Sequence, residues 1–413
     1  MKYCLIGEKL GHSYSAEIHS QNGLDYALKE IRREQIADFI GQGYDGFNIT
    51  IPYKKDIIPY LVGVSDAAKN IGAVNTAVKV KGGYYGYNTD IVGLEYVLSR
   101  KGISLKNKRV AVLGSGGAAA TANALCAAQG AKSAITVSRS GEINYRNCYD
   151  HTDTQIVINA TPVGMFPNMG KSPVDLSRFY NLEGAVDCVY NPFRTRFILQ
   201  AQKLGVVCSD GLPMLVKQAL AAEELWGVAT KECDCENIIG ALYRKKVNAV
   251  LIGMPSAGKT AVAEILGKIL GRTVIDTDEE VYKATGKTPA EIITERGEPA
   301  FRWAETAAVK TAAAKSGVII ATGGGAVLKE ENTLALAANG LCFWVKRDLS
   351  LLSDKGRPLS KGKSAERLFE ERKEFYERAA DFTVENDTTP QDCAEKIAEI
   401  FRKAEINPKT AKS

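Results

Sequence analysis

The sequence predicts an α/β protein with two separate nucleotide-binding regions. In the stretch 108–131, KRVAVLGSGGAAATANALCAAQGA, an apolar strand runs into a glycine turn and then a helix. In the stretch 247–270, an apolar strand, the loop GMPSAGKT and a helix follow one another. Both patterns place a glycine-rich turn between a strand and the positive end of a helix, where phosphates bind. The remaining strand and helix patterns alternate, which favours parallel sheets.

The loop at 253–260 matches the phosphate-binding pattern G-x-x-x-x-G-K-[ST]. Its glycines let backbone N–H groups surround a phosphate, its lysine reaches the outer phosphates, and its threonine can ligate Mg²⁺. We therefore predict ATP and Mg²⁺ as ligands. The predicted ATP-binding residues of this loop are Gly253, Ser256, Ala257, Gly258, Lys259, Thr260 and Ala261.

The earlier turn matches G-x-G-x-x-[GA] and predicts a dinucleotide site. The next strand, 133–140, ends in Ser138, Arg139 and Ser140. It lacks the terminal acidic residue that holds the ribose in proteins that bind NAD. This end suits the 2′-phosphate of NADP(H), although an ordinary exposed arginine is the alternative. The predicted NADP-binding residues are Gly114, Ser115, Gly116, Gly117, Ala118, Ser138, Arg139, Ser140 and Gly211.

Composition narrows the class of protein. The chain has 413 residues, 45% of them hydrophobic, which is enough for two or three globular domains. Its net charge of +5 is scattered, which argues against a nucleic-acid partner and suits anionic substrates. Nine irregularly spaced cysteines and three histidines give no zinc pattern and suggest reduced thiols in the cytoplasm. We find no apolar signal core and no run of transmembrane length, so we expect no membrane partner.

A loop with the pattern G-x-x-x-x-G-K-[ST] normally lies near the start of its domain. A domain boundary should therefore lie shortly before residue 247. We expect five segments: an α/β substrate domain over 1–95 that the helix 212–227 completes, a Rossmann-type NADP domain over 96–231, a linker over 232–246, a kinase-type α/β domain with a parallel sheet over 247–405, and a disordered tail over 406–413.

Polar residues gather where the N-terminal strands end. Polar groups at the strand ends of an α/β domain often line a ligand crevice. Taken singly, each is better explained as a turn or cap residue, and Ser15 is the expected N-cap of the helix that follows it. The set comprises Ser13, Ser15, Asn48, Thr50, Lys54, Asn75, Asn88, Thr89 and Asp90.

Four further patterns follow the second glycine loop. The strand in 273–287 ends in DTD, so Asp276 and Asp278 should lie two apart on a strand end and serve different partners. The helix 289–314 places Arg302 and Glu305 on one face. The strand in 317–329 ends in three glycines, which let a ligand approach the backbone. The polar segment 353–366 is typical of a mobile lid.

With these motifs in hand, residues 1 to about 230 resemble shikimate dehydrogenase. The matching motifs are HSYS, NITIPYK, GAVNT, GYNTD, GSGGAA, INATPVGM, DCVYNP and DGLPMLVKQA, in that family's order. Residues from about 247 to 402 resemble shikimate kinase through GMPSAGKT, IDTDEEV, FRWAE, TGGGAV, GRPL and ERKEFY. The resemblance implies a fused bifunctional enzyme of aromatic amino acid biosynthesis. It would reduce 3-dehydroshikimate with NADPH and phosphorylate the resulting shikimate with ATP.

By resemblance, Lys54 and Asp90 are the catalytic pair of the dehydrogenase. The chemistry is reasonable in itself, because hydride arrival makes an alkoxide, and a lysine beside an aspartate can protonate it. An ordinary ion pair in the cleft is the alternative. The substrate contacts implied by the resemblance are Ser13 and Ser15 for the carboxylate, and Asn48, Thr50, Asn75, Tyr190 and Gln218 for the ring and its hydroxyls.

By resemblance, the second half transfers the γ-phosphate of ATP to shikimate. Asp276 would order the water shell of Mg²⁺, which Thr260 ligates, and Asp278 would hold and could deprotonate the accepting hydroxyl. The remaining implied roles belong to Lys259 on the nucleotide, Arg357 in the lid over the phosphates, Arg302 and Arg372 on the shikimate carboxylate, and Gly323, Gly324 and Gly325 against the ring. For Arg372, a solvated face of a charged helix is the alternative, and Arg378 is the neighbour that could take its place.

The sequence departs from the two families in places. Ala16 stands where the dehydrogenases have proline, and the kinase lid lacks an arginine upstream of Arg357, which concerns nucleotide affinity more than catalysis. Two rival functions remain: a pseudoenzyme regulator that senses quinate or shikimate, and a quinate dehydrogenase fused to a kinase for another small acid. The charged catalytic candidates are all present, which argues against the first, and Arg139 argues against NAD in the second.

Overall fold

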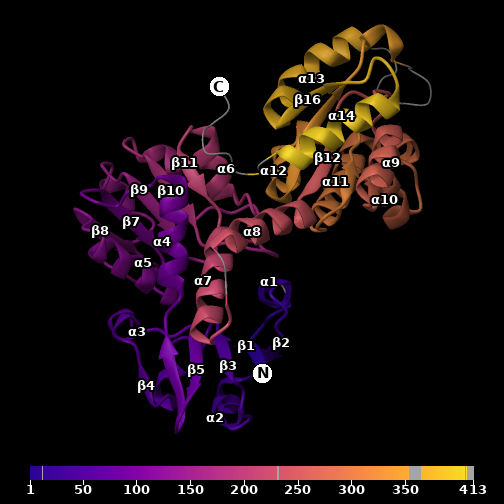
Figure 1. Ribbon diagram of the computed structural model, residues 1–413. Coiled ribbons are helices and arrows are strands. Elements are labelled where there is room, and N and C mark those ends of the chain that lie inside the picture. Colours follow the sequence, from indigo (N-terminus) through magenta and orange to yellow (C-terminus); the bar gives the residue numbers. More distant parts are fainter. Residues whose placement is uncertain (12, 230–231, 353–363, 405, 407–413) are drawn as a thin grey trace. The chain divides into compact units, whose positions relative to one another are not determined.

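The computed structural model describes residues 1–11, 13–229, 232–352, 364–404 and 406 (Figure 1). This part of the chain forms two compact units, Met1–Ala241 and Leu242–Ile406. The expected linker 232–246 is helical, because helix α8 spans Glu232–Lys246, and the division between the units falls within it. The end of the expected tail, 407–413, lies outside the described residues.

The N-terminal sheet of the first unit is mixed, with the strand order β2-β1-β3-β5-β6-β4. β1 pairs in parallel with β2 and β3, whereas β5 pairs antiparallel with β3 and β6. The antiparallel β5 and β6 form a hairpin. The elements are β1 (Tyr3–Gly7), α1 (Ser15–Gln21), β2 (Tyr26–Glu30), α2 (Ile36–Ile40), β3 (Gly46–Ile49), β4 (Gly63–Val64), α3 (Asp66–Ile71), β5 (Thr76–Val80) and β6 (Gly83–Tyr87).

The second sheet of this unit is parallel throughout, with the order β11-β10-β9-β7-β8. The first strand in sequence therefore lies inside the sheet, beside the second and the third, as in doubly wound folds. This sheet confirms the predicted dinucleotide-type α/β architecture. Its elements are α4 (Asp90–Lys101), β7 (Arg109–Leu113), α5 (Gly117–Ala128), β8 (Ser133–Val137), β9 (Ile156–Asn159), β10 (Gly184–Asp187), α6 (Arg196–Lys203), β11 (Val207–Ser209) and α7 (Leu212–Leu225).

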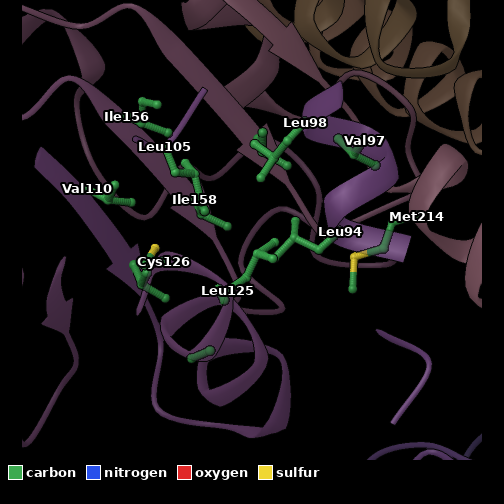
Figure 2. Packing of buried hydrophobic residues seen from close by; sticks show 14 residues of the cluster. Leu94, Val97, Leu98, Leu105, Val110, Leu125, Cys126, Ile156, Ile158 and Met214 are labelled. Atoms are coloured by element: carbon green, nitrogen blue, oxygen red, sulfur yellow. The ribbon is translucent and has the colours of Figure 1, made fainter. Parts of the chain in front are cut away.

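Helices α4 and α5 bury their apolar faces against β7 and β9 of this sheet (Figure 2). Leu94 and Leu98 on α4 are four residues apart and so lie on one helix face. Each fully buried leucine or isoleucine contributes about 1.5–3 kcal/mol relative to an exposed one. This packing fixes α4, whose first residue is Asp90. The labelled core residues are Leu94, Val97, Leu98, Leu105, Val110, Leu125, Cys126, Ile156, Ile158 and Met214.

Helix α7 follows the last strand of the second sheet and packs against α1 and α4 (Figure 1). Directly after it, the indole Nε1 of Trp226 donates to the Ala77 carbonyl of β5 over 3.0 Å, and the indole stacks on Tyr3 with ring centroids 4.6 Å apart. A Cβ on Gly46 would lie only 2.5 Å from the indole Cδ1, so the N-terminal sheet leaves room for this ring. Residues from both ends of the first unit therefore build the core of the N-terminal sheet.

The second unit holds one parallel sheet with the order β13-β14-β12-β15-β16. β12 is central and its five residues are all buried, as its continuous apolar sequence predicts. The elements are β12 (Asn248–Ile252), α9 (Lys259–Leu270), β13 (Val274–Asp276), α10 (Thr277–Thr285), α11 (Pro289–Ala313), β14 (Ile319–Ala321), α12 (Glu330–Asn339), β15 (Gly340–Lys346), α13 (Ala365–Ala379), β16 (Phe382–Glu385) and α14 (Pro390–Lys403).

Two local expectations for this unit need correction. Asp276 and Asp278 do not share a strand end: Asp276 ends β13 and caps α10, and Asp278 lies in the first turn of that helix. The expected single helix 289–314 is interrupted at Gly297, where φ is 82° and ψ is 168°. A non-helical glycine two residues before Pro299 breaks the helical hydrogen bonds and divides α11 into two arms.

Candidate active sites

Lys54 and Asp90 form a close pair in the first unit. Lys54 Nζ lies 2.5 Å from Asp90 Oδ2, and the lysine and aspartate side chains are only 17% and 8% exposed. A Cβ on Gly117, the first residue of α5, would lie 3.3 Å from Lys54 Cδ. The lysine therefore lies between a buried carboxylate and the glycine turn of the parallel sheet. A proton donor that acts beside a dinucleotide needs this arrangement.

A hydrogen-bonded cluster fixes the carboxylate of Asp90. Asn75 Nδ2 donates to Asp90 Oδ1 over 2.9 Å and lies 3.2 Å from Gln218 Oε1. Asn75 Oδ1 accepts the backbone N–H of Thr89 over 2.7 Å, and Thr89 Oγ1 lies 3.0 Å from Asn75 Nδ2. Both oxygens of Asp90 are therefore held, one by an amide and one by an ammonium group.

Sequence reasoning missed the linking role of Thr89. Its hydroxyl lies within hydrogen-bonding distance of both Asn75 and Gln218, which it joins. The only signal was its place between two polar residues in Asn-Thr-Asp, a pattern that turns without any ligand also show.

Asn48, an expected substrate contact, has several hydrogen-bond partners within the chain. Its Oδ1 accepts the Tyr26 hydroxyl over 2.6 Å, and its Nδ2 donates to Thr76 Oγ1 over 3.0 Å and to the Asn75 carbonyl over 3.3 Å. An amide nitrogen carries two hydrogens, so these bonds use both. The side chain is buried, and its contacts favour a role in holding the loop at Asn75.

Ser13 and Ser15 are expected at the substrate carboxylate, and Tyr190 is expected at the ring. Ser13 Oγ donates to Ser15 Oγ over 3.1 Å and accepts the Ser15 N–H over 3.2 Å. The expectation that Ser15 caps α1 is wrong, because Tyr14 occupies the N-cap and Ser15 is the first helical residue. Burial raises the pKa of Tyr190 to about 12, although a hydrogen bond with Ser13 lowers it, so the phenol keeps its proton. Thr50 lies just after β3, with its methyl group over Gly7.

The glycine turn between β7 and α5 is open to an anion. A Cβ on Gly116, the N-cap of α5, would meet open space in the described part of the chain, so the helix N-terminus is accessible. Gly114 lies against the end of the neighbouring strand β9, and a Cβ on Gly114 would be 3.0 Å from the Ala160 carbonyl oxygen. Beyond β8, Ser138 is buried whereas Arg139 and Ser140 are exposed. Gly211 is the N-cap of α7, with no room for a Cβ beside the Cys188 carbonyl.

In the second unit, the phosphate-binding loop holds its own lysine. Lys259 Nζ donates to the carbonyls of Gly253 over 2.9 Å and Met254 over 2.8 Å. Gly258 has a φ of 85°, which glycine adopts readily, and this turn starts α9. Ser256 has a positive φ of 64°, an uncommon conformation for a residue with a side chain. Ala257 packs in the core below the loop, and Ala261 follows in the first turn of α9.

Oxygen ligands for a hard cation lie beside this loop. Thr260 Oγ1 donates to Asp276 Oδ2 over 2.8 Å, and Asp276 Oδ1 accepts the backbone N–H of Asp278 over 2.9 Å. Mg²⁺ prefers a few such oxygens together with water. Thr260 and Asp276 therefore fit a magnesium ion held next to the phosphates.

Arg302 is fixed by two carboxylates. Its Nη1 donates to Glu305 Oε2 over 2.7 Å, and its Nη2 donates to Glu298 Oε1 over 2.9 Å. Glu305 is 1% exposed, so this pair is buried. Burial raises the pKa of Glu305, and Arg302 opposes that effect. The expectation that Arg302 and Glu305 share a helix face is confirmed.

Three glycines after β14 bring these groups together. A Cβ on Gly323 would lie 2.8 Å from Asp278 Oδ1, and one on Gly325 would lie 2.7 Å from Arg302 Cζ. A Cβ on Gly324 would lie 2.6 Å from the Cδ of the proline in the phosphate-binding loop. The backbone at 323–325 is therefore packed directly against the aspartate, the arginine and the nucleotide loop.

Of the two candidate arginines on α13, the structure favours Arg372. Its Nη1 donates to the Gly324 carbonyl over 3.2 Å, and the residue is 7% exposed. The Arg378 side chain is 66% exposed and pairs with Glu374 on the same helix. Arg357, expected over the phosphates, lies outside the described residues.

In comparisons with known proteins, the first and second parts of the chain match different families. A family model described as the shikimate dehydrogenase substrate binding domain matches residues 5–77. The shikimate dehydrogenase (NADP(+)) of Clostridium beijerinckii is 36% identical over 256 residues, which cover 57% of this chain and 93% of the relative. The chain belongs to the shikimate dehydrogenase family. A second family model, described as shikimate kinase, matches residues 255–402.

Solved structures of shikimate dehydrogenases resemble the first part of the chain. A chorismate mutase/shikimate 5-dehydrogenase fusion protein from Clostridium acetobutylicum is 37% identical, with a TM-score of 0.55, over 58% of this chain and 96% of that one. Shikimate 5-dehydrogenase from Thermus thermophilus, solved with NADP(H) and shikimate, is 28% identical, with a TM-score of 0.52, over 58% of this chain and 98% of that one.

The predicted pairing of a shikimate dehydrogenase with a shikimate kinase is thereby confirmed, as is the predicted fold class. The chain is a bifunctional shikimate pathway enzyme, and the pseudoenzyme alternative is not favoured. Among the helices of the described residues, none is long and apolar enough to cross a bilayer.

Proposed function

We propose that this chain reduces 3-dehydroshikimate to shikimate with NADPH and then phosphorylates shikimate with ATP to shikimate 3-phosphate. The observation that carries the proposal is the position of Lys54, 2.5 Å from Asp90 and directly against the glycine turn at Gly117. The cluster of Asp278 and Arg302 on the glycine loop 323–325 supports the second reaction. Both reactions concern one oxygen, because the ketone reduced in the first becomes the hydroxyl phosphorylated in the second.

In the dehydrogenase, NADPH would supply a hydride to the carbonyl carbon. Lys54 donates a proton to the oxygen that becomes the alkoxide, and Asp90 holds the ammonium group in place for that transfer. Asn75 fixes the carboxylate of Asp90 and, with Gln218, contacts the ring hydroxyls. The remaining roles are carboxylate binding by Ser13 and Ser15, contacts with the ring and its hydroxyls by Asn48, Thr50 and Tyr190, and binding of the 2′-phosphate by Ser138, Arg139 and Ser140.

In the kinase, Lys259 moves from the loop carbonyls to the nucleotide phosphates, which are stronger acceptors. Thr260 directly, and Asp276 through water, would hold Mg²⁺, which would neutralise charge on the phosphates. Asp278 accepts a hydrogen bond from the attacking hydroxyl and takes its proton. Arg302 and Arg372 bind the carboxylate of shikimate, and their planar guanidinium groups match it. Arg357 remains a predicted phosphate contact, and the cytoplasmic location remains a prediction from cysteine usage.

The test is a single reaction that contains 3-dehydroshikimate, NADPH, ATP and Mg²⁺. We expect NADPH to be oxidised and ADP to appear. Lys54→Ala should stop both signals with 3-dehydroshikimate, because no shikimate forms, yet it should release ADP normally when shikimate is added. Lys259→Ala should stop ADP release only. If a folded chain leaves NADPH unchanged, the dehydrogenase function is excluded.

A further inference from the structure

Tyr376 is a buried residue of α13 to which neither family resemblance assigned a role. It lies one helical turn after Arg372, so both face the same side of the helix. Its hydroxyl donates to the Gly324 carbonyl over 2.6 Å, and its ring stacks on Trp344 with centroids 5.7 Å apart. The residue is 0% exposed, and its short hydrogen bond joins α13 to the half-buried glycine loop.

The same carbonyl receives a second donor. Arg372 Nη1 also donates to Gly324 O, but over the longer distance of 3.2 Å. A carbonyl oxygen has two lone pairs and can accept both. Burial raises the pKa of Tyr376 to about 12, an effect that Arg372 opposes, so the phenol stays protonated at neutral pH and can donate.

We propose that Tyr376 is a positioning residue of the kinase, which keeps the Gly324 carbonyl occupied so that Arg372 is free to bind the carboxylate of the substrate. The Gly324 carbonyl is half-buried, and a carbonyl that loses one donor forms a hydrogen bond with another that lies near. While Tyr376 supplies a short bond, the long bond from Arg372 is dispensable, and the guanidinium can turn its N–H groups to the acid. Without the phenol, the arginine is the donor that remains to Gly324 in the described part of the chain, and the carbonyl competes with the substrate for it. This inference rests on the proposed kinase function.

Tyr376→Phe tests the proposal, because it removes the hydroxyl and keeps the ring that stacks on Trp344. The KM for shikimate in the kinase reaction should rise about three- to tenfold, the worth of one net hydrogen bond. The kcat and the KM for ATP should hardly change, because the phosphate-binding loop is untouched. Tyr282→Phe, at a tyrosine that is 52% exposed on α10, is the matched control and should leave all three constants as they are.

The Arg372→Ala background separates positioning from packing. There, Tyr376→Phe should add no further rise in the KM for shikimate, because the competing guanidinium is absent. An unchanged KM in the single variant, or an equal rise with and without Arg372, would overturn the proposal. Calorimetric titration with shikimate, well below the melting temperature of each variant, gives the same comparison without turnover. An unsubstituted chain that releases no ADP would instead refute the kinase function itself.

Discussion

Gly325 offers a way to displace Arg302 without replacing it. The glycine has a φ of −104° and a ψ of 0°, a conformation that alanine also adopts. An alanine Cβ would overlap Arg302 Nη1 and would lie 2.5 Å from Nη2 and 2.7 Å from Cζ. Because the backbone accepts alanine, Gly325→Ala should act through the guanidinium alone.

The size of the effect follows from these distances. Non-bonded carbon and nitrogen atoms settle at roughly 3.5 Å, so the guanidinium must shift by about 1 Å. The 2.7 Å bond from Arg302 Nη1 to Glu305 Oε2 would then exceed hydrogen-bonding range. Breaking a buried pair outright costs about 3–5 kcal/mol, and since Glu298 stays in reach we expect about 1–3 kcal/mol of lost stability. A misplacement of about 1 Å at a substrate-holding group costs about 100-fold in rate.

The assay is shikimate-dependent ADP release. We expect kcat/KM for shikimate to fall about 100-fold, whereas the KM for ATP should stay unchanged. The dehydrogenase activity of the same sample serves as an internal control for protein quality. The unfolding free energy of the second unit should be measured in parallel by denaturant titration.

Arg302→Ala provides the decisive background. If Gly325→Ala acts by displacing the guanidinium, it should add little once that group is gone. An equal loss of activity in both backgrounds would show that the methyl group obstructs the substrate directly. Full activity of the single variant would refute the packing argument altogether.

Three further outcomes are expected. Burial raises the pKa of Asp187 to about 7, so ionisation is disfavoured in the folded state and stability should fall as pH rises from about 4 to 7. Asp187→Asn should reduce this pH-dependent loss of stability, measured by thermal unfolding at several pH values. An unchanged dependence of stability on pH in the variant would contradict the prediction. Arg139→Ala should raise the KM for NADPH about tenfold or more and leave that for NADH unchanged, and equal rises would exclude a 2′-phosphate contact. Trp226→Ala should destabilise the first unit by about 3–5 kcal/mol, measured by denaturant titration. Kinase turnover should persist in this variant, and an equal loss of the dehydrogenase and kinase activities would contradict the prediction.

The sequence predicted best those features that local backbone geometry dictates. The loop at 253–260 needs fixed glycine positions between a strand and a helix, so its pattern identified β12 and α9 together. The same holds for the glycine turn between β7 and α5. Arg302 and Glu305 were paired correctly, because a spacing of three residues on a helix brings side chains together wherever the helix lies.

The sequence predicted less well the features that depend on distant partners. Asn48 bonds with Tyr26 and Thr76, which are 22 and 28 residues away, and no local period encodes those contacts. The break at Gly297 was missed because glycine inside an otherwise helical pattern is often tolerated. Ser15 has the side chain of a cap, but the turn that the Ser13 hydroxyl stabilises starts the helix one residue earlier than a serine cap would require.

The return of the chain through α7 to the N-terminal sheet limits how this protein could have been assembled. Trp226 completes a core that begins at Tyr3, so a domain boundary between these two residues would separate the dehydrogenase from part of its own interior. A kinase joined after Trp226 leaves the core of the dehydrogenase whole. A boundary between the two enzymes is therefore disfavoured anywhere from Tyr3 to Trp226, and helix α8, within which the two units divide, begins six positions beyond the tryptophan, at Glu232.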